Sequence, residues 1–239
     1  MPPTTTRELA ARLPDVPRLV ETRAMLLSGV SEVIGDTARG HYVVRSLDAA
    51  LAALVGRPRA AALRDAVAGG RTLDILCAED AVRHALASLP GWRAHPAIVH
   101  ALPPHAVLPA LPAAVDVRLV AGADSVPLAH VPSPLREEFE AARRRAPIVV
   151  GFTEGHAASF AYVPWQTETL CDLSIDTLEA YRRRGLAAAT ASRLIERVRA
   201  SGKEPVWGAL EDNAPSLALA KRLGFVPVDR LFVLSRRRH

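Results

Sequence analysis

The sequence has little cysteine and no long apolar run, and each shortage narrows the class of protein. Only two cysteines, Cys77 and Cys171, occur among 239 residues, too few for the disulfide framework of a small secreted domain. No apolar run reaches the roughly 18–20 residues of a membrane span, and the first residues contain no signal-peptide core. We therefore expect a cytoplasmic protein with reduced thiols and no membrane partner.

Aromatic residues and motifs for nucleic acid, nucleotide or metal are also scarce. A net charge of +5 suits an anionic ligand, but the arginine clusters are short and no zinc-finger spacing or aromatic ribbon supports binding to nucleic acid. No GxxxxGK[ST] motif indicates a nucleotide P-loop. His95, His100 and His105 recur at a spacing that does not place them on one face, so we expect no metal site.

The apolar content of 49% is enough for a buried core, and the order of elements indicates an α/β protein. The proline-rich segment Ala101–Pro112 breaks both helices and strands. It predicts a boundary between an N-terminal α/β domain, 1–114, and a C-terminal domain, 115–239.

The C-terminal part alternates between strand and helix patterns. Strands are expected at 115–122, 147–163 (a hairpin around a Thr-Glu-Gly turn), 167–178, 205–210 and 230–235, and helices at Ser133–Arg145, after Gly185 and at 213–223. The N-terminal part is harder to interpret. It shows helix patterns at 16–29 and 79–89, and strand patterns at 72–78 and 92–102.

The densest positive charge of the chain stands at the start of an expected helix. Three arginines, 182–184, run into Gly185, and small residues follow. A helix start leaves four backbone amides without partners and carries partial positive charge, so an anion can satisfy several donors there. The bare backbone at Gly185 suits a pyrophosphate. The alternative is a structural helix that begins at a glycine and has solvated arginines.

Two motifs resemble those of a known superfamily. Arg182-x-x-Gly185-x-Ala187 after a strand resembles the acyl-CoA signature of the GNAT-type N-acetyltransferases, and "NAPSLALAKRLGF" (Asn213–Phe225) resembles their second signature. The resemblance covers roughly residues 115–239. It looks closest to the subgroup that includes the zwittermicin A resistance acetyltransferase.

The resemblance implies a mixed sheet whose fourth and fifth strands splay apart to admit the pantetheine of acetyl-CoA. It implies that an acetyl group passes to the primary amine of a small molecule by direct attack on the thioester. A backbone amide of the splayed strand would hold the oxyanion. The expected cofactor contacts are Ile175, Asp176, Thr177, Arg182, Arg183, Arg184, Gly185, Leu186, Ala187, Ala188, Asn213 and Ser216.

The catalytic side chains depart from the family pattern. Many members carry a Tyr as proton donor seven residues after the Asn, where this chain has Ala220. Ser216, water or the more remote Tyr162 remains for that role. The family's base register falls on Cys171, so Glu168 and Asp172 are the nearest acids for a general base, unless they are hydrogen-bonded strand-edge carboxylates. The alternative function is a non-catalytic acyl-CoA-binding or protein-interaction module.

The N-terminal half contains a pattern that parallels the C-terminal one. Val55–Trp92 and Arg184–Phe225 both run glycine, helix, strand, Glu-Asp, Ala/Leu-rich helix, glycine and aromatic. Either this half is a degenerate copy of the GNAT-like fold, or Ala-rich helices match by chance. If this half is a copy, Pro58 removes one of the backbone amides that would bind the pyrophosphate, so we expect this half not to bind CoA. We expect it to shape the acceptor pocket or to form a homodimer face.

Overall fold

The computed structural model describes residues 4–68, 73–109 and 115–236. These form two compact units that are not contiguous in sequence. The first unit holds the described residues up to His100, then Gly208–Ala214 and the described residues from Pro227 on; the second holds the described residues of Ala101–Trp207 and Pro215–Val226. The predicted boundary at 114/115 falls on residues 110–114, which lie outside the described ones. Strands and helices mix in both units, which confirms the predicted α/β class.

The first unit begins with helices and continues with strands. Its elements are α1 (Thr6–Arg12), a 3₁₀ turn (Pro17–Leu19), α2 (Val20–Leu27), β1 (Ser31–Asp36), β2 (His41–Ser46), β3 (Leu51–Val55), α3 (Ala60–Val67), β4 (Asp74–Cys77), α4 (Glu79–Ser88) and β5 (Trp92–Ala101). A capping box starts α1, because the Thr5 hydroxyl accepts from the Glu8 amide at 3.2 Å and the Glu8 carboxylate accepts from the Thr5 amide at 2.8 Å. The predictions for 16–29, 72–78, 79–89 and 92–102 are confirmed in type.

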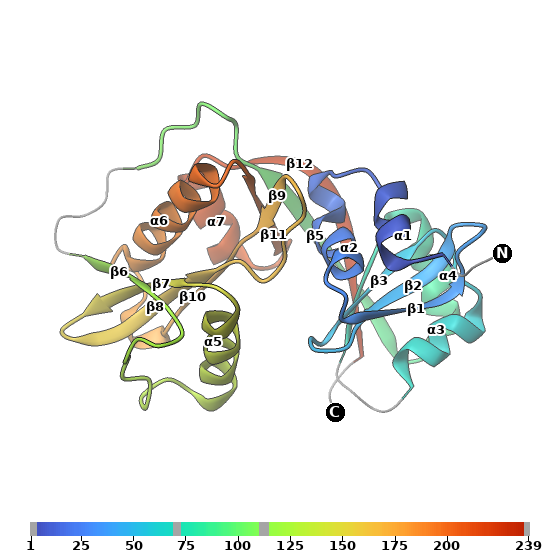
Figure 1. Cartoon of the computed structure of the whole chain (residues 1–239), viewed down its shortest axis with the longest axis horizontal. Coiled ribbons are helices and arrows are strands. Elements are labelled where there is room, and N and C mark those ends of the chain that lie inside the picture. Colours follow the sequence, from blue (N-terminus) through green and yellow to red (C-terminus); the bar gives the residue numbers. More distant parts are fainter. Residues whose placement is uncertain (1–3, 69–72, 110–114, 237–239) are drawn as a thin grey trace. The chain divides into compact units, whose positions relative to one another are not determined.

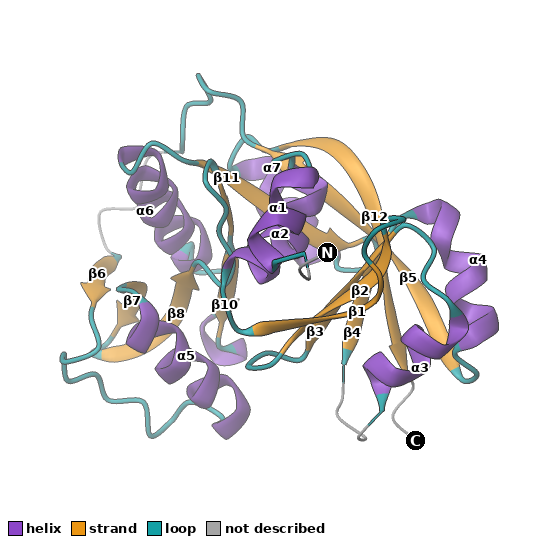
Figure 2. Ribbon diagram, turned by 45° about the vertical axis from the view of Figure 1, so that its right-hand side comes forward, coloured by secondary structure: helices purple, strands orange, loops and turns teal. Residues whose placement is uncertain are grey.

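The sheet of the first unit is covered on both faces. Figure 2 shows α1 and α2 on one face and α3 and α4 on the other. Successive residues of β2 point to opposite faces, and both Val43 and Val44 are fully buried. Val43 joins Leu63 of α3 and Ala85 of α4 in one apolar cluster. Two-sided burial explains why these strands are apolar runs rather than alternating patterns.

The strand order of the larger sheet is β1-β2-β3-β4-β12-β5-β11-β9. Here β11 (Glu204–Leu210) belongs partly to each unit, and β12 (Val226–Arg236) ends the described chain. In the middle of the sheet, β4 and β5 of the N-terminal half alternate with β12 and β11 of the C-terminal half. β12 pairs antiparallel with β4, with Val233 opposite Leu76. Each half of the sequence therefore places its last strand beside a strand of the other half.

The second unit contains the elements that the sequence predicted best. They are β6 (Asp116–Val120), α5 (Ser133–Arg145), β7 (Ile148–Thr153), β8 (His156–Tyr162), β9 (Leu170–Asp172), β10 (Ser174–Thr177), a 3₁₀ turn (Glu179–Tyr181), α6 (Leu186–Ala200), part of β11, and α7 (Ala214–Arg222). β7 and β8 form the predicted hairpin, and its turn places Glu154 at φ 51° and Gly155 at φ 79°. Helix α5 spans the predicted residues, with Pro132 as its N-cap and Ser133 as its first residue.

A four-stranded sheet with the order β10-β8-β7-β6 forms the centre of the second unit. Helix α6 covers one face and α5 the other (Figure 1). On the α5 face, the Phe139 ring stacks on Phe160 of β8 with centroids 3.8 Å apart, and both rings are fully buried. On the α6 face, Gly151 is needed for close packing, because a Cβ there would lie 2.9 Å from the Thr190 methyl. In the described part of the chain, no helix has the length and apolar composition to cross a membrane.

Sequence analysis missed α1 and the first three strands, and it treated 167–178 as one strand. That prediction is wrong, because the segment breaks at Leu173 into β9 and β10, which lie in different sheets. The break creates the geometry of the candidate site.

Candidate active site

The predicted pyrophosphate site, called the phosphate cradle below, is the first turn of α6. Gly185 is the N-cap residue with φ 81°, and Arg183 also has a positive φ of 63°. Glycine adopts this conformation without steric cost. The first bond of the helix runs from the Ala189 amide to the Gly185 carbonyl at 3.1 Å. The amides of the residues between them therefore precede the helical ladder and lack an intrahelical acceptor.

The three arginines before the helix are all exposed, whereas Leu186 and Ala188 are buried. The Arg182 Nε donates to the Thr177 carbonyl at 3.3 Å, which ties the loop to the end of β10. The Arg184 guanidinium lies 3.6 Å from the Glu154 carboxylate and 5.5 Å from the centroid of the Tyr181 ring. Positive charge and free amides thus meet at one helix start, which suits a phosphate group.

The strand break places an open edge beside this helix start. β9 pairs in parallel with β11 as far as Asp172 opposite Val206, and the last bond runs from the Leu173 amide to the Val206 carbonyl at 3.1 Å. The next residue, Ser174, pairs instead with Tyr162 of β8. The chain therefore leaves β11 at Leu173, as the splayed fourth and fifth strands of the resemblance require.

The register shows which main-chain groups of β10 are exposed along this edge. The Leu178 amide donates to the Ala158 carbonyl at 2.9 Å, and bonded pairs alternate in antiparallel sheets. Asp176, two residues earlier and opposite Phe160, therefore directs its main chain toward β8. Ile175 and Thr177 direct theirs away from β8, toward the open edge. Of the three predicted pantetheine contacts, these two have the suitable backbone orientation.

A buried hydroxyl network joins β10 to α6 beneath the cradle. The Ser159 hydroxyl of β8 lies 2.8 Å from the Thr177 hydroxyl and 3.1 Å from that of Thr190. Thr190 also donates to carbonyls of the first turn of α6, at 3.1 Å from that of Leu186. Ser159 and Thr190 are both fully buried. The network fixes the helix start relative to the strand.

The predicted catalytic acids lie before β9 and at its end. Glu168 is exposed in the turn before the strand, and Asp172 is half-buried as its last residue, directly before the break. Their role as base stays a prediction. At the family's base register, Cys171 is buried, and burial raises the pKa of its thiol, with Asp172 adding to this and Lys203 opposing it. A neutral thiol there does not act as a base.

The residues of the second signature lie around α7. Asn213 is exposed, and its amide donates to the Leu210 carbonyl at 3.0 Å. The Ser216 hydroxyl accepts from the Trp207 indole at 3.0 Å. Trp207 itself is buried and packs 5.4 Å from the Phe225 ring, so it is a core residue. Ala220, at the place of the family's Tyr, is fully buried and offers no proton.

Sequence analysis missed a polar group on the α5 face of β10. The Tyr162 hydroxyl donates to the Glu138 carboxylate of α5 and accepts from the Ser174 hydroxyl at 3.2 Å. The side chain of Asp176 lies on the same face. Burial, and then the negative charge of Glu138, raise the pKa of Asp176 to about 6, while Arg182 opposes the shift. The only signal in the sequence was an acid within an expected strand.

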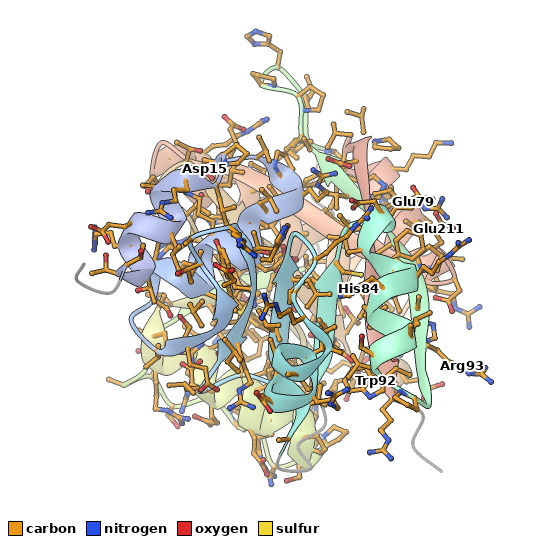
Figure 3. All side chains as sticks on the ribbon, turned by 90° about the vertical axis from the view of Figure 1, so that its right-hand side faces the viewer. Asp15, Glu79, His84, Trp92, Arg93 and Glu211 are labelled. Atoms are coloured by element: carbon orange, nitrogen blue, oxygen red, sulfur yellow. The ribbon has the colours of Figure 1, made fainter. Side chains whose placement is uncertain are left out.

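The corresponding glycine turn in the N-terminal half is closed, and α3 begins only at Ala60, with Arg59 as its N-cap. Gly56 has φ 61°, like Gly185, but a Cβ there would collide with the His41 ring. The Arg57 amide donates to His41 Nδ1 at 3.1 Å. Nε2 of His84 (labelled in Figure 3) donates to the Pro58 carbonyl at 2.5 Å. The His41 imidazole thus occupies the turn at Gly56, and the expectation that this half does not bind CoA stays a prediction.

Comparisons with known proteins agree with this geometry. A model of the GNAT acetyltransferase family matches residues 154–233, from the β7–β8 turn into β12. Among curated proteins, none matches the chain. In the part of the chain that the structure describes, His, Cys, Asp and Glu side chains form no group of three or more that could hold a metal ion.

Solved structures resemble nearly the whole chain. A GCN5-related N-acetyltransferase-like protein from Streptococcus suis 89/1591 has 19% identity and a TM-score of 0.71, over 97% of this chain and 98% of that one. A GCN5-related N-acetyltransferase from Kribbella flavida has 16% identity and a TM-score of 0.62, over 100% and 98%. A tandem GNAT protein from the clavulanic acid biosynthesis pathway has 16% identity and a TM-score of 0.57, over 96% and 92%. Residues 154–233 thus match the GNAT acetyltransferase family, and the chain has the fold of solved GNAT proteins.

Proposed function

We propose that this protein transfers an acetyl group from acetyl-CoA to the primary amine of a small molecule. The observation that carries the proposal is the departure of β10 from β11 at Leu173, in the same unit as the exposed helix start at Gly185. The open edge suits the pantetheine, and the helix start suits the diphosphate. Acyl-CoA-dependent acetyl transfer is also what the family match indicates.

The residues present fit acetyl-CoA. The unpaired amides at the start of α6 can donate to diphosphate oxygens, and the exposed arginines supply counter-charge. The outward main chain of Ile175 and Thr177 can pair with the pantetheine amides. Holding the thioester against one edge lets an amine approach in line, which supplies much of the rate enhancement in such reactions. That Asn213 and Ser216 lie near the thioester end stays a prediction.

The finer features of the proposal come from the sequence. An acceptor of the amino-sugar or antibiotic type follows from the resemblance to the zwittermicin A resistance subgroup. A cytoplasmic location agrees with two cysteines that are both free and buried. A homodimer remains a prediction.

A second candidate function is acyl-CoA binding without catalysis. The observation that favours it is Ala220, which is buried where many family members place a proton-donating Tyr. Calorimetry with acetyl-CoA and a thiol-release assay over a panel of amino sugars, polyamines and amino acids separate the two functions. Thiol release with mass-spectrometric detection of the acetylated amine supports transfer, whereas binding without release with any amine supports the second function.

The cofactor site is tested with two glycines that flank the same helix. Gly185 and Gly202 both have positive φ, 81° and 77°, so an alanine at either place adds similar strain of roughly 1–2 kcal/mol. A Cβ at Gly202 has no neighbour within 4 Å, and that glycine lies beyond the C-terminal end of α6. Gly185→Ala should lower CoA affinity at least tenfold, and Gly202→Ala should not. Equal affinities in calorimetry would place the diphosphate elsewhere.

A further inference from the structure

The Asp176 carboxylate is a half-buried acid without a structural partner. Among the described residues, none forms a hydrogen bond or an ion pair with it; the Ser159 hydroxyl donates only to its main-chain carbonyl, at 3.2 Å. The neighbouring acid Glu138, by contrast, accepts a hydrogen bond from the Tyr162 hydroxyl. Half-burial of an unpaired carboxylate costs free energy. An acid at position 176 therefore calls for a reason other than stability.

The position of Asp176 supplies that reason. β10 is the edge strand that departs from β11, so this residue stands along the open edge. Side chains alternate between faces, and Asp176 shares a face with Ser174, whose hydroxyl contacts Tyr162. That face looks toward α5, whereas the α6 face carries the phosphate cradle. An acceptor that approaches from the α5 side would meet this carboxylate without crossing the cofactor path.

The charged and titratable groups around Asp176 come from three elements. Glu138 on α5 adds negative charge, and its carboxylate accepts a hydrogen bond from the Tyr162 hydroxyl of β8. Arg182, before α6, adds positive charge. Burial and Glu138 outweigh Arg182, so the pKa of Asp176 lies at about 6. An acid with that pKa is ionised at neutral pH and still basic enough to take a proton.

We propose that Asp176 accepts the proton that the acceptor's ammonium group must lose before it attacks the thioester. This inference rests on the proposed acetyl transfer. One N–H bond of the ammonium breaks and the proton passes to an Asp176 carboxylate oxygen. The freed nitrogen pair forms the N–C bond, the C–S bond breaks, and the sulfur keeps its electron pair. A second N–H proton leaves the new amide nitrogen for the thiolate, and Asp176 returns its own proton to solvent.

Replacement of Asp176 and of its neighbours tests the proposal through the pH profile of kcat/KM. In the wild type the rate should rise with pH through about 6, as the carboxylate ionises. Asp176→Asn should abolish this rise, the acid limb of the profile, and should lower kcat/KM at pH 7.5 about 10²-fold. Glu138→Gln should move the limb to lower pH, because it removes the negative charge that opposes ionisation. Glu137→Gln, the same change one residue away on α5, should leave the limb in place.

Two further measurements separate the possible failures. In carbon-13 NMR without substrate, the Asp176 carboxyl should titrate near pH 6, and lower in Glu138→Gln. In calorimetry, Asp176→Asn should bind CoA like the wild type; loss of binding would make the carboxylate structural and overturn the proposal. Asp176→Asn that keeps the limb, or Glu168→Gln or Asp172→Asn that loses it, would also overturn it. A wild type that acetylates no amine would instead refute the transfer function, and the role of Asp176 with it.

Discussion

Replacing Glu21 with glutamine should change how stability depends on pH. Glu21 lies on α2, and its carboxylate lies 4.0 Å from where a Cβ at Gly208 of β11 would sit. Burial raises its pKa from 4.5 to about 7, and the bond from its own amide opposes this only in part. The folded protein therefore binds a proton at Glu21 more tightly than the unfolded chain does.

The sign and size of this pH dependence follow from proton linkage. Because the folded pKa is raised, the folded state binds more protons between pH 4.5 and about 7, and its stability falls as pH rises through that window. At about 1.4 kcal/mol for each pKa unit, the wild type loses about 3 kcal/mol across it. Glu21→Gln cannot ionise and should keep that stability at pH 8.

The assay is urea unfolding at pH 4.5 and pH 8, followed by circular dichroism. The difference between Glu21→Gln and the wild type should be small at pH 4.5 and about 3 kcal/mol in favour of the variant at pH 8. Glu8→Gln is a control of opposite sign, since hydrogen bonds from Thr5 lower the pKa of Glu8 and its contribution disappears as pH falls. Parallel stability curves for Glu21→Gln and the wild type would refute the reasoning.

Two more predictions follow from the site. Thr190→Val keeps the side-chain shape but removes the hydroxyl from the Ser159 network, so it should cost about 1–3 kcal/mol in stability and weaken CoA binding. Thr190→Ser keeps the hydroxyl and should retain CoA affinity. Thermal unfolding and calorimetry with both variants check this, and wild-type CoA affinity in Thr190→Val would show that packing alone positions the start of α6. Because the His41 ring occupies the turn at Gly56, calorimetry should count one CoA for each chain, and a count of two would contradict the proposal that only the start of α6 binds CoA.

The parts of the site that are local in sequence were predictable. Gly185 and the small residues after it specify a left-handed residue followed by a helix, and that conformation is present. The α5 helix was predicted with correct ends because prolines and charges mark its start and its last turn. Such signals depend on neighbours along the chain, so they need no knowledge of tertiary contacts.

The remaining features depend on distant contacts. The change of sheet at Leu173 results from competition between β8 and β11 for the same segment, which an apolar pattern does not reveal. Asp176 gains its character from Glu138, 38 positions earlier in the sequence, through the way α5 packs on the sheet. Strands β2 and β3 were missed because they are buried on both faces and so lack an alternating pattern, although the turn at Gly40, with φ 71°, marks a hairpin.

The alternation of β4, β12, β5 and β11 makes the two halves of the sequence depend on each other. A fragment that stops before residue 115 would lack β12, so β4 would lose its antiparallel neighbour. A fragment that starts there would lack β5, which lies between β12 and β11. Truncation at the proline-rich segment should therefore give insoluble halves, and co-expression of both halves should restore a folded complex. The N-terminal half would then be needed to complete the sheet of the C-terminal half, independently of any ligand of its own.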